Sequence, residues 1–193
     1  MRFNYECLEI IKNEEEREEW YVFDNETSVQ VIHRWWLDEE ESHPLMVLYF
    51  LLRNKDKNNL LASFRILCSN PETIRLPSNQ DWSKDDWICF CEDYNFNYQA
   101  SPTFTTPELK TQGINAYLED VRVEPRYRNQ GFGTQLIEFA KDYLRYRQLS
   151  NGLLTYPFAV EAKENPEQTH RVQQFYERIG FEPWQHPYYC CLF

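Results

Sequence analysis

The strongest constraint on the fold of this sequence is a short glycine-containing stretch, RNQGFG, at residues 128–133. It lies between an extended apolar segment, Tyr117 to Val123, and a stretch with helical periodicity that runs to about Arg147. Glycine permits close approach and adopts backbone angles that other residues avoid. The first turn of a helix adds free N–H groups and the positive end of the helix dipole. The sequence therefore predicts a site for a phosphate or diphosphate at this turn.

Two common phosphate-binding patterns do not fit this turn. The dinucleotide fingerprint G-x-G-x-x-G fails because its last position is Leu136. The phosphate-loop pattern fails because no Gly-Lys-Ser/Thr follows the glycines. For an isolated match, a tight strand-to-helix turn without a ligand is the alternative, so the rest of the chain has to decide between them.

Charge and composition limit the class of partner. The chain has 193 residues, 42% of them hydrophobic, and a net charge of −11, which suits one folded domain over residues 1–193. A nucleic-acid surface would need clustered Lys and Arg, so we expect no nucleic-acid partner. The negative field favours cationic or neutral partners such as amines, although a charge that serves solubility alone explains it equally well.

The sequence also predicts a cytoplasmic protein without a membrane segment or a metal. Its longest apolar run, Leu45 to Leu52, is too short to span a bilayer, and the N-terminus has no apolar signal core. The six cysteines are then expected to be reduced thiols. Neither Cys89-x-Cys91 nor Cys190-Cys191 has zinc-site spacing, and a metal held by these with His186 is the weaker alternative.

The N-terminal part predicts a strand followed by two helices. Tyr5 to Ile11 alternates apolar and polar residues, and the acidic run at residues 13–16 resembles a helix start. A second helix is expected after Asp24-Asn25 because apolar positions follow at i, i+3, i+4 and i+7. These positions are Val29, Ile32, His33 and Trp36, and the histidine is expected to be a core residue rather than a ligand.

The middle of the chain predicts a hairpin and then an insertion. Two apolar runs, Leu45 to Leu52 and Leu60 to Leu67, are joined by a polar loop. Residues 69–113 have little periodicity and interleave aromatics with carboxylates, and we interpret them as an insertion within the single domain. Such a surface suits a cationic ligand, but packing of the aromatics onto the body of the protein is the favoured explanation.

The C-terminal half alternates strands and helices. The strand Tyr117 to Val123 precedes the first helix, and Leu153 to Val160 is the next predicted strand. Pro166 fits the first turn of a second helix, which Gly180 ends. A last pair of short strands is expected around His186-Pro187.

These elements resemble the GCN5-related N-acetyltransferase (GNAT) superfamily. The pattern Arg128-x-x-Gly131-x-Gly133 is similar to its acetyl-CoA pyrophosphate motif, Q/R-x-x-G-x-G/A. Residues 175–181, FYERIGF, resemble a second motif in which a tyrosine-bearing helix ends at Gly-Phe, and residues 117–120, YLED, resemble the central strand of polyamine-type members. The resemblance covers residues 117–193. It implies a mixed α/β fold with a twisted mixed sheet of about six to seven strands, flanked by helices, and an insertion before the central strand.

The resemblance implies acetyl-CoA as co-substrate, held by the central strand, the glycine turn and the next helix. One departure concerns the pantetheine arm, because Thr169 stands where the family often has Asn. Either the Thr169 hydroxyl substitutes, or Asn165 serves from an extended helix start. The expected cofactor-binding residues are Val121, Arg122, Val123, Arg128, Asn129, Gln130, Gly131, Phe132, Gly133, Thr134, Asn165 and Thr169.

The implied reaction moves an acetyl group from a thioester to an amine, which must lose a proton to attack. Glu119 and Asp120 are adjacent in a strand and so face opposite sides, unless the bulge that the family has in this strand intervenes. We take Glu119 as the expected base, with Asp120 second or as amine anchor; an ordinary ion-paired carboxylate is the alternative. Tyr176 is the expected acid for the departing thiolate, against plain core packing.

The acceptor is less constrained than the cofactor. A small amine or polyamine is the first hypothesis, and a protein N-terminus or lysine side chain is the second. A CoA-binding module without catalysis is an alternative of another class. We retain a homodimer as an option, since the sequence does not fix the oligomeric state.

Overall fold

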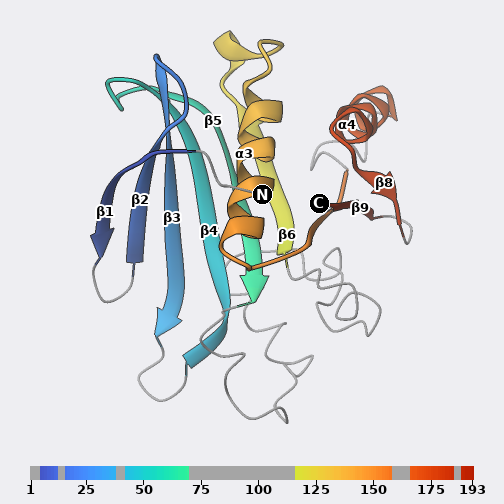
Figure 1. The fold of residues 1–193 in the computed structure, drawn as a ribbon. Coiled ribbons are helices and arrows are strands. Elements are labelled where there is room, and N and C mark those ends of the chain that lie inside the picture. Colours follow the sequence, from blue (N-terminus) through green and yellow to red (C-terminus); the bar gives the residue numbers. More distant parts are fainter. Residues whose placement is uncertain (1–4, 13–15, 38–41, 70–115, 158–165, 185–187) are drawn as a thin grey trace.

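The structure, a computed structural model, describes residues 5–12, 16–37, 42–69, 116–157, 166–184 and 188–193. The predicted insertion at residues 69–113 lies almost entirely outside this part of the chain. The described residues build a mixed α/β fold in which two α-helices accompany one large sheet (Figure 1).

Over the described residues the sheet has nine strands in the order β1-β2-β3-β4-β5-β6-β7-β9-β8. The first six strands pair in antiparallel fashion in chain order, β6 pairs with β7 in parallel, and β7, β9 and β8 are antiparallel. The strand count exceeds the predicted six to seven. The strands are β1 (Cys7–Lys12), β2 (Glu16–Val22), β3 (Thr27–Leu37), β4 (Ser42–Asn54), β5 (Leu60–Ser69), β6 (Ala116–Val123), β7 (Gly152–Thr155), β8 (Glu182–Pro183) and β9 (Tyr189–Leu192).

The two helices predicted in the N-terminal part are wrong, because β2 and β3 occupy those residues. The helical spacing from Val29 also contains an alternation: Val29, Val31 and His33 are buried on one face of β3. Pairing of this strand with β4 along its whole length decides the outcome, since tertiary contacts override weak local preferences. The turn before it is closed by Asp24, whose Oδ1 accepts the backbone N–H groups of Glu26 and Thr27 at 2.7 Å.

The strand at the N-terminus and the central hairpin are confirmed. β1 covers most of the predicted segment Tyr5 to Ile11. β4 and β5 pair in antiparallel register over Leu45↔Ser69 to Arg53↔Leu60. Their inward residues form much of the core, including Leu48, Phe50, Phe64 and Ile66.

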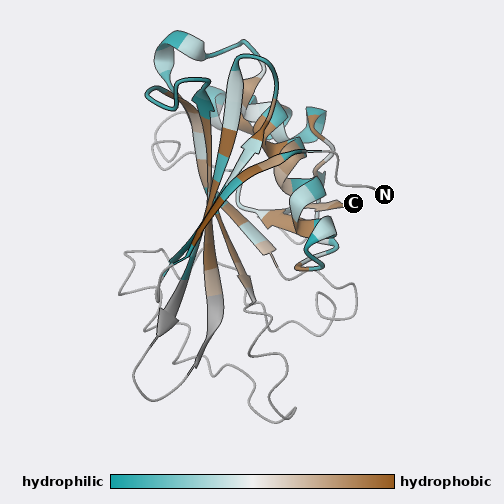
Figure 2. Ribbon diagram, turned by 60° about the vertical axis from the view of Figure 1, so that its left-hand side comes forward, coloured by the Kyte–Doolittle hydropathy of each residue, from teal (hydrophilic) through white to brown (hydrophobic). Residues whose placement is uncertain are grey.

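The C-terminal helices fall where the sequence predicted them. The helices are η1 (Pro125–Tyr127), α3 (Phe132–Tyr146) and α4 (Pro166–Arg178). α3 buries its apolar stripe against the middle of the sheet, and Figure 2 shows hydrophobic residues where helices and strands meet. The end of α4 packs on α3, since Lys141 Nζ donates to the Ile179 carbonyl at 2.6 Å.

The strand predicted over Leu153 to Val160 is shorter than expected. β7 ends at Thr155, and neither Tyr156 nor Pro157 continues it. Pro157 has no backbone N–H for a ladder hydrogen bond, which explains why pairing stops before it. Among the described residues, the carboxyl end of β6 therefore has no paired strand on its β7 side.

Candidate functional site

The glycine turn opens α3 without a side-chain cap. Gly131 is the N-cap residue at φ +85°, a left-handed conformation that favours glycine, and Asn129 also has a positive φ of +61°. The first helical hydrogen bond runs from Gln135 N–H to the Gly131 carbonyl at 3.0 Å. The N–H groups of Phe132, Gly133 and Thr134 therefore precede the ladder and are available to an anion.

Gly133 serves a different purpose from Gly131. It is buried, and a Cβ atom added there would lie 3.1 Å from Val123 Cγ2 and 3.8 Å from Phe175 Cζ. The second glycine of the motif thus lets the start of α3 lie directly on the end of β6 and beside α4. By contrast, a Cβ at Gly131 would meet only Gln135 Nε2, at 4.0 Å.

The side chains around the turn are mostly exposed and partly fixed by backbone carbonyls. Arg128 Nε donates to the Val123 carbonyl at 3.3 Å, and Gln130 Nε2 donates to the Arg126 carbonyl at 3.1 Å. The first of these contacts holds the Arg128 guanidinium at the end of β6, in the turn that leads into α3. A diphosphate fits this donor set, because it needs both N–H groups and positive charge.

β6 has a bulge at the position where the family resemblance implied one. Glu119 pairs with Arg65 and Arg122 pairs with Ser63, so two residues of β6 lie opposite the single residue Phe64 of β5. A bulge of this kind interrupts the ladder and re-aims side chains. It places Glu119 and Arg122 on the same face of the sheet, and it leaves Val121 without a ladder partner in β5.

Among the described residues, the pairing of β6 with β7 ends directly before this bulge. Their parallel pairing is limited to Tyr117↔Leu154 and Leu118↔Thr155, and the Thr155 hydroxyl donates to the Leu118 carbonyl at 3.1 Å. Beyond this point the bulged end of β6 has no strand on its β7 side among the described residues. The glycine turn, the bulge and the end of the pairing with β7 therefore lie toward one end of β6.

Glu119, the expected base, lies in an ion pair across the sheet. Arg65 Nε donates to Glu119 Oε2 at 3.1 Å, and the side chains are 23% and 14% exposed respectively. Asp120 forms part of the bulge, and its side chain lies outside the described part of the structure. Glu119 is thus an ion-paired carboxylate, which the sequence left open as an alternative, and it lies next to the bulge.

Tyr176, the expected acid, is buried at 6% exposure near the end of α4. Its ring packs edge-on against Phe175 and Phe181, with centroids 5.3 Å apart in both pairs. Burial, followed by the charges of Glu119 and of the neighbouring tyrosines including Tyr176, raises the pKa of Tyr117 well above its usual value. Tyr176 is therefore packed in the core and also lies near Tyr117 of β6.

Three tyrosines that lie near one another, around Tyr117 on β6, were not among the predicted site residues. Tyr117 is buried on β6, and Tyr156 and Tyr188 are half-buried with ring centroids 5.8 Å apart. Burial and the neighbouring Tyr156 raise the pKa of Tyr188 to about 12, so its phenol keeps its proton at neutral pH. No spacing in the sequence links these tyrosines, because they lie on three separate segments.

The remaining predicted cofactor residues divide between turn, strand and helix. Val121 and Val123 are half-buried and pack on the core, and Arg122 is exposed. Thr169 is half-buried in the first turns of α4, whereas Asn165 lies outside the described residues. The choice between Thr169 and Asn165 for the pantetheine contact stays a prediction.

Metal and membrane features were searched over the same described ranges. No group of three or more His, Cys, Asp or Glu residues there has an arrangement that could hold a metal ion. Cys190 and Cys191 are free thiols on β9, while Cys89, Cys91 and His186 lie outside those ranges. No helix in this part of the chain is long and apolar enough to cross a membrane.

Comparison with known proteins agrees with this geometry. A search of curated proteins gives no match to the chain. Residues 98–183 match the family model described as an acetyltransferase (GNAT) domain. The matched segment includes the bulged strand, the glycine turn, α3 and α4, and the family it describes uses acetyl-CoA to acetylate an acceptor. This match supports the resemblance of residues 98–183 to the GNAT superfamily.

Proposed function

We propose that this protein is an N-acetyltransferase that moves an acetyl group from acetyl-CoA to a primary amine, with a small amine or polyamine as the favoured acceptor. The observation that supports it is the coincidence, at one end of β6, of an uncapped helix N-terminus, a bulge and the end of the described pairing with β7. An anion held at the helix would direct the rest of an extended ligand along this end of β6.

Binding of the co-substrate is assigned to the turn. The N–H groups of Phe132, Gly133 and Thr134, with the Arg128 guanidinium, would hold the diphosphate. These donors fit its charge because α3 has no side-chain cap that competes for the same amides.

The chemical step is assigned to the end of β6. Acetyl-CoA supplies an acetyl thioester whose C–S bond breaks as the C–N bond to the amine forms. Glu119 would take the proton that the amine nitrogen loses, with Asp120 as second candidate. The N–H groups of Val121 to Val123 would stabilise the charge that develops on the carbonyl oxygen. Tyr176 would give its proton to the departing thiolate.

The acceptor hypothesis depends on charge. The net charge of −11 favours an approaching cation, and the carboxylate at the bulge offers a partner for an amine. A protein N-terminus or a lysine side chain has the same chemistry and is the second acceptor hypothesis.

A CoA-binding module without catalysis is the candidate from another class. The Arg65–Glu119 ion pair and the aromatic packing of Tyr176 favour it, because both groups then have structural roles that need no reaction. The phosphate-binding turn is equally compatible with both functions.

One experiment separates these functions. CoA binding is measured by calorimetry, and thiol release from acetyl-CoA is measured against small amines, polyamines, lysine peptides and free peptide N-termini. Release with small amines or polyamines supports the proposal, and release with peptides alone supports the second acceptor. Binding without release would identify a module, and the absence of CoA binding would exclude all of these functions.

A further inference from the structure

A buried cluster of polar groups lies between the N-terminal strands and α3, away from the end of β6. Its centre is the Glu19 carboxylate on β2, which is completely buried. From the same strand, the Tyr21 hydroxyl donates to Glu19 Oε2, and the Arg17 guanidinium pairs with Oε1. Burial disfavours the charged carboxylate and would raise its pKa. Hydrogen bonds from His33, Tyr21 and Tyr143 outweigh this effect and hold the pKa of Glu19 below its usual value. The group is therefore ionised at neutral pH.

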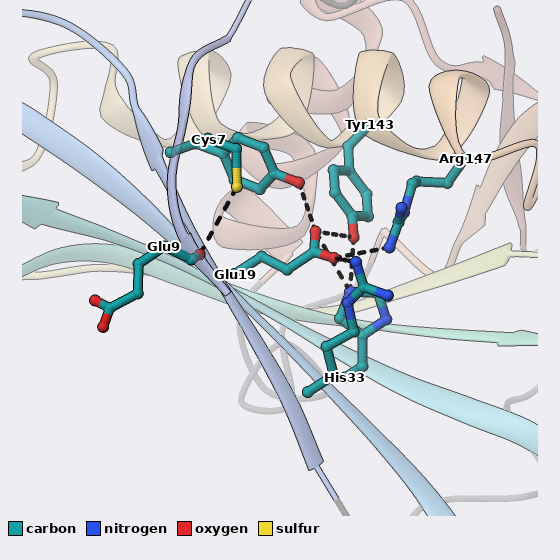
Figure 3. A network of polar contacts seen from close by, with 8 residues as sticks. Cys7, Glu9, Glu19, His33, Tyr143 and Arg147 are labelled. Carbon is teal, nitrogen blue, oxygen red and sulfur yellow. Dashed lines mark hydrogen bonds and ion pairs between the residues drawn. The ribbon is translucent and has the colours of Figure 1, made fainter. Parts of the chain in front are cut away.

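Two further contacts to Glu19 come from α3. The Tyr143 hydroxyl donates to Glu19 Oε2 at 2.7 Å, and Arg147 Nη2 donates to Oε1 at 2.7 Å. Figure 3 shows both side chains extending from the helix to the carboxylate. They are four residues apart and thus lie on one face at the C-terminal end of the helix.

His33 completes the cluster from β3. Its Nε2 lies 2.6 Å from the Tyr143 hydroxyl oxygen and 3.8 Å from Glu19 Oε2. Since Tyr143 donates its only proton to the ionised carboxylate, the short contact requires His33 Nε2 to donate to the hydroxyl oxygen. One carboxylate therefore fixes a directed chain of donors from two strands and one helix.

The remaining contacts of α3 with the sheet are mainly apolar. Leu136, Ile137, Phe139, Ala140 and Leu144 are fully buried, and such contacts have no preferred direction. Hydrogen bonds to a charged group weaken steeply when their geometry changes, so they fix the position of the helix along its axis. A helix transmits an axial displacement along its length, and Tyr143 lies roughly 16 Å from Phe132 at the free amides.

We propose that Glu19 is a positioning residue for coenzyme A binding. It holds the C-terminal end of α3 so that the N–H groups at its start face the diphosphate. The inference rests on the proposed function, because it assigns to the cluster an effect on the affinity for that ligand. A cluster that serves stability alone is the competing explanation.

Tyr143→Phe tests the inference, and Tyr21→Phe is its matched control. Each variant removes one hydroxyl that donates to the same oxygen of Glu19, but only Tyr143 belongs to α3. We expect Tyr143→Phe to weaken CoA binding by about tenfold in calorimetry, and Tyr21→Phe to bind like the parent. Both variants are expected to lower the melting temperature.

A truncated substrate provides a readout that a structural role would not change. S-acetylpantetheine lacks the diphosphate, so a displaced helix start should leave its kcat/KM unchanged in Tyr143→Phe while kcat/KM for acetyl-CoA falls. Should Tyr143→Phe fail to fold, Arg147→Met removes the other contact from α3 and keeps an apolar stem.

The outcomes are distinct. Weaker CoA binding in Tyr143→Phe alone supports the inference. Parent-like CoA binding in Tyr143→Phe, or equal weakening in both variants, would overturn it and leave the proposed function intact. A parent protein that binds no CoA would overturn the proposed function and this inference together.

Discussion

The two halves of the sheet are held together in different ways. From β1 to β5 the chain forms an antiparallel meander whose neighbouring strands are also neighbours in sequence. From β6 onward, strands alternate with α3 and α4, and β6 meets β7 in parallel for only two residue pairs. The first half buries a charged network at Glu19, whereas the second half leaves free amides and an interrupted ladder. Pairing is continuous through the first half, and it is interrupted in the second half, where we propose that the ligand binds.

This difference predicts that substitutions at the end of β6 act on ligand binding and turnover, while substitutions in the meander act on stability. Substitutions in the Glu19 cluster are expected to affect both stability and ligand binding, because two of its side chains belong to α3. The following predictions test this division.

The largest effect is expected at Gly131. Gly131→Asp puts a carboxylate where the diphosphate would lie, on a residue at φ +85°. An added Cβ has open space there, so charge and backbone strain cause the effect rather than a clash. We expect acetyl-CoA affinity to fall at least about 100-fold, or ~2.7 kcal/mol, in calorimetry.

Gly180→Asp, at φ +87° beyond α4, is the control and should lower only stability. Unchanged affinity in Gly131→Asp would remove the turn from the mechanism.

The next largest effect is expected at Glu119. Glu119→Gln should lower the rate by about 100-fold, and most at low pH, where the neutral amine is scarce. Arg65→Met breaks the same ion pair but keeps the carboxylate, and should retain most of the turnover. The measurement is a pH–rate profile of both variants. Equal losses in the two variants would identify the pair as structural, and a parent-like profile of Glu119→Gln would transfer the role to Asp120 or water.

A smaller effect is expected at Tyr176. Tyr176→Phe keeps the packing against Phe175 and Phe181 but removes the hydroxyl, so kcat should fall about tenfold while CoA affinity stays near normal. Tyr189→Phe is the control, since its hydroxyl bonds the exposed Glu177 at 3.2 Å. Equal kcat in Tyr176→Phe and the parent would make Tyr176 a packing residue.

The smallest effect concerns stability in the meander. The pKa of His33 is lowered, mainly by burial. The hydrogen bond and negative charge of Glu19 oppose this shift, and the positive charges of Arg147 and Arg17 add to it. An unfolded histidine titrates near pH 6.5, so the unfolded state binds the proton first and stability falls as pH drops below about 6.5. The loss stops once the pH lies below the pKa of His33 in the folded protein.

Denaturant unfolding at pH 7.5 and 5.5 measures this loss. In His33→Gln the difference between the two pH values should be smaller than in the parent. The Glu19 carboxylate, whose pKa is lowered, adds a separate loss only below its usual value of 4.5. The same pH dependence in both proteins would show that His33 does not titrate in this range.

The local patterns of the second half were sufficient to predict its elements. The start of α3 needs a glycine with positive φ, Pro166 fits the first turn of α4, and Gly180 follows that helix at φ +87°. These are properties of single residues and their neighbours, so the sequence shows them. The bulge after Glu119 followed from the family resemblance, and no pattern in the strand itself marks it.

Long-range pairing explains what the sequence did not show. The spacing from Val29 fits a helix and a strand, and only the register with β4 selects the strand. The partners of Glu119 and Glu19 likewise come from residues 54 and 128 positions away, Arg65 and Arg147. Contacts of this kind depend on register across several strands, which no short window contains.

The sequence by itself determined a glycine turn between a strand and a helix, because glycine conformation and a free helix N-terminus are local properties. Only the tertiary structure decided that β6 bulges beside an Arg65–Glu119 pair and that Glu19 fixes the far end of α3. The physical reason is that a buried charge is tolerated only where several distant donors converge on it, and the fold alone brings those donors together.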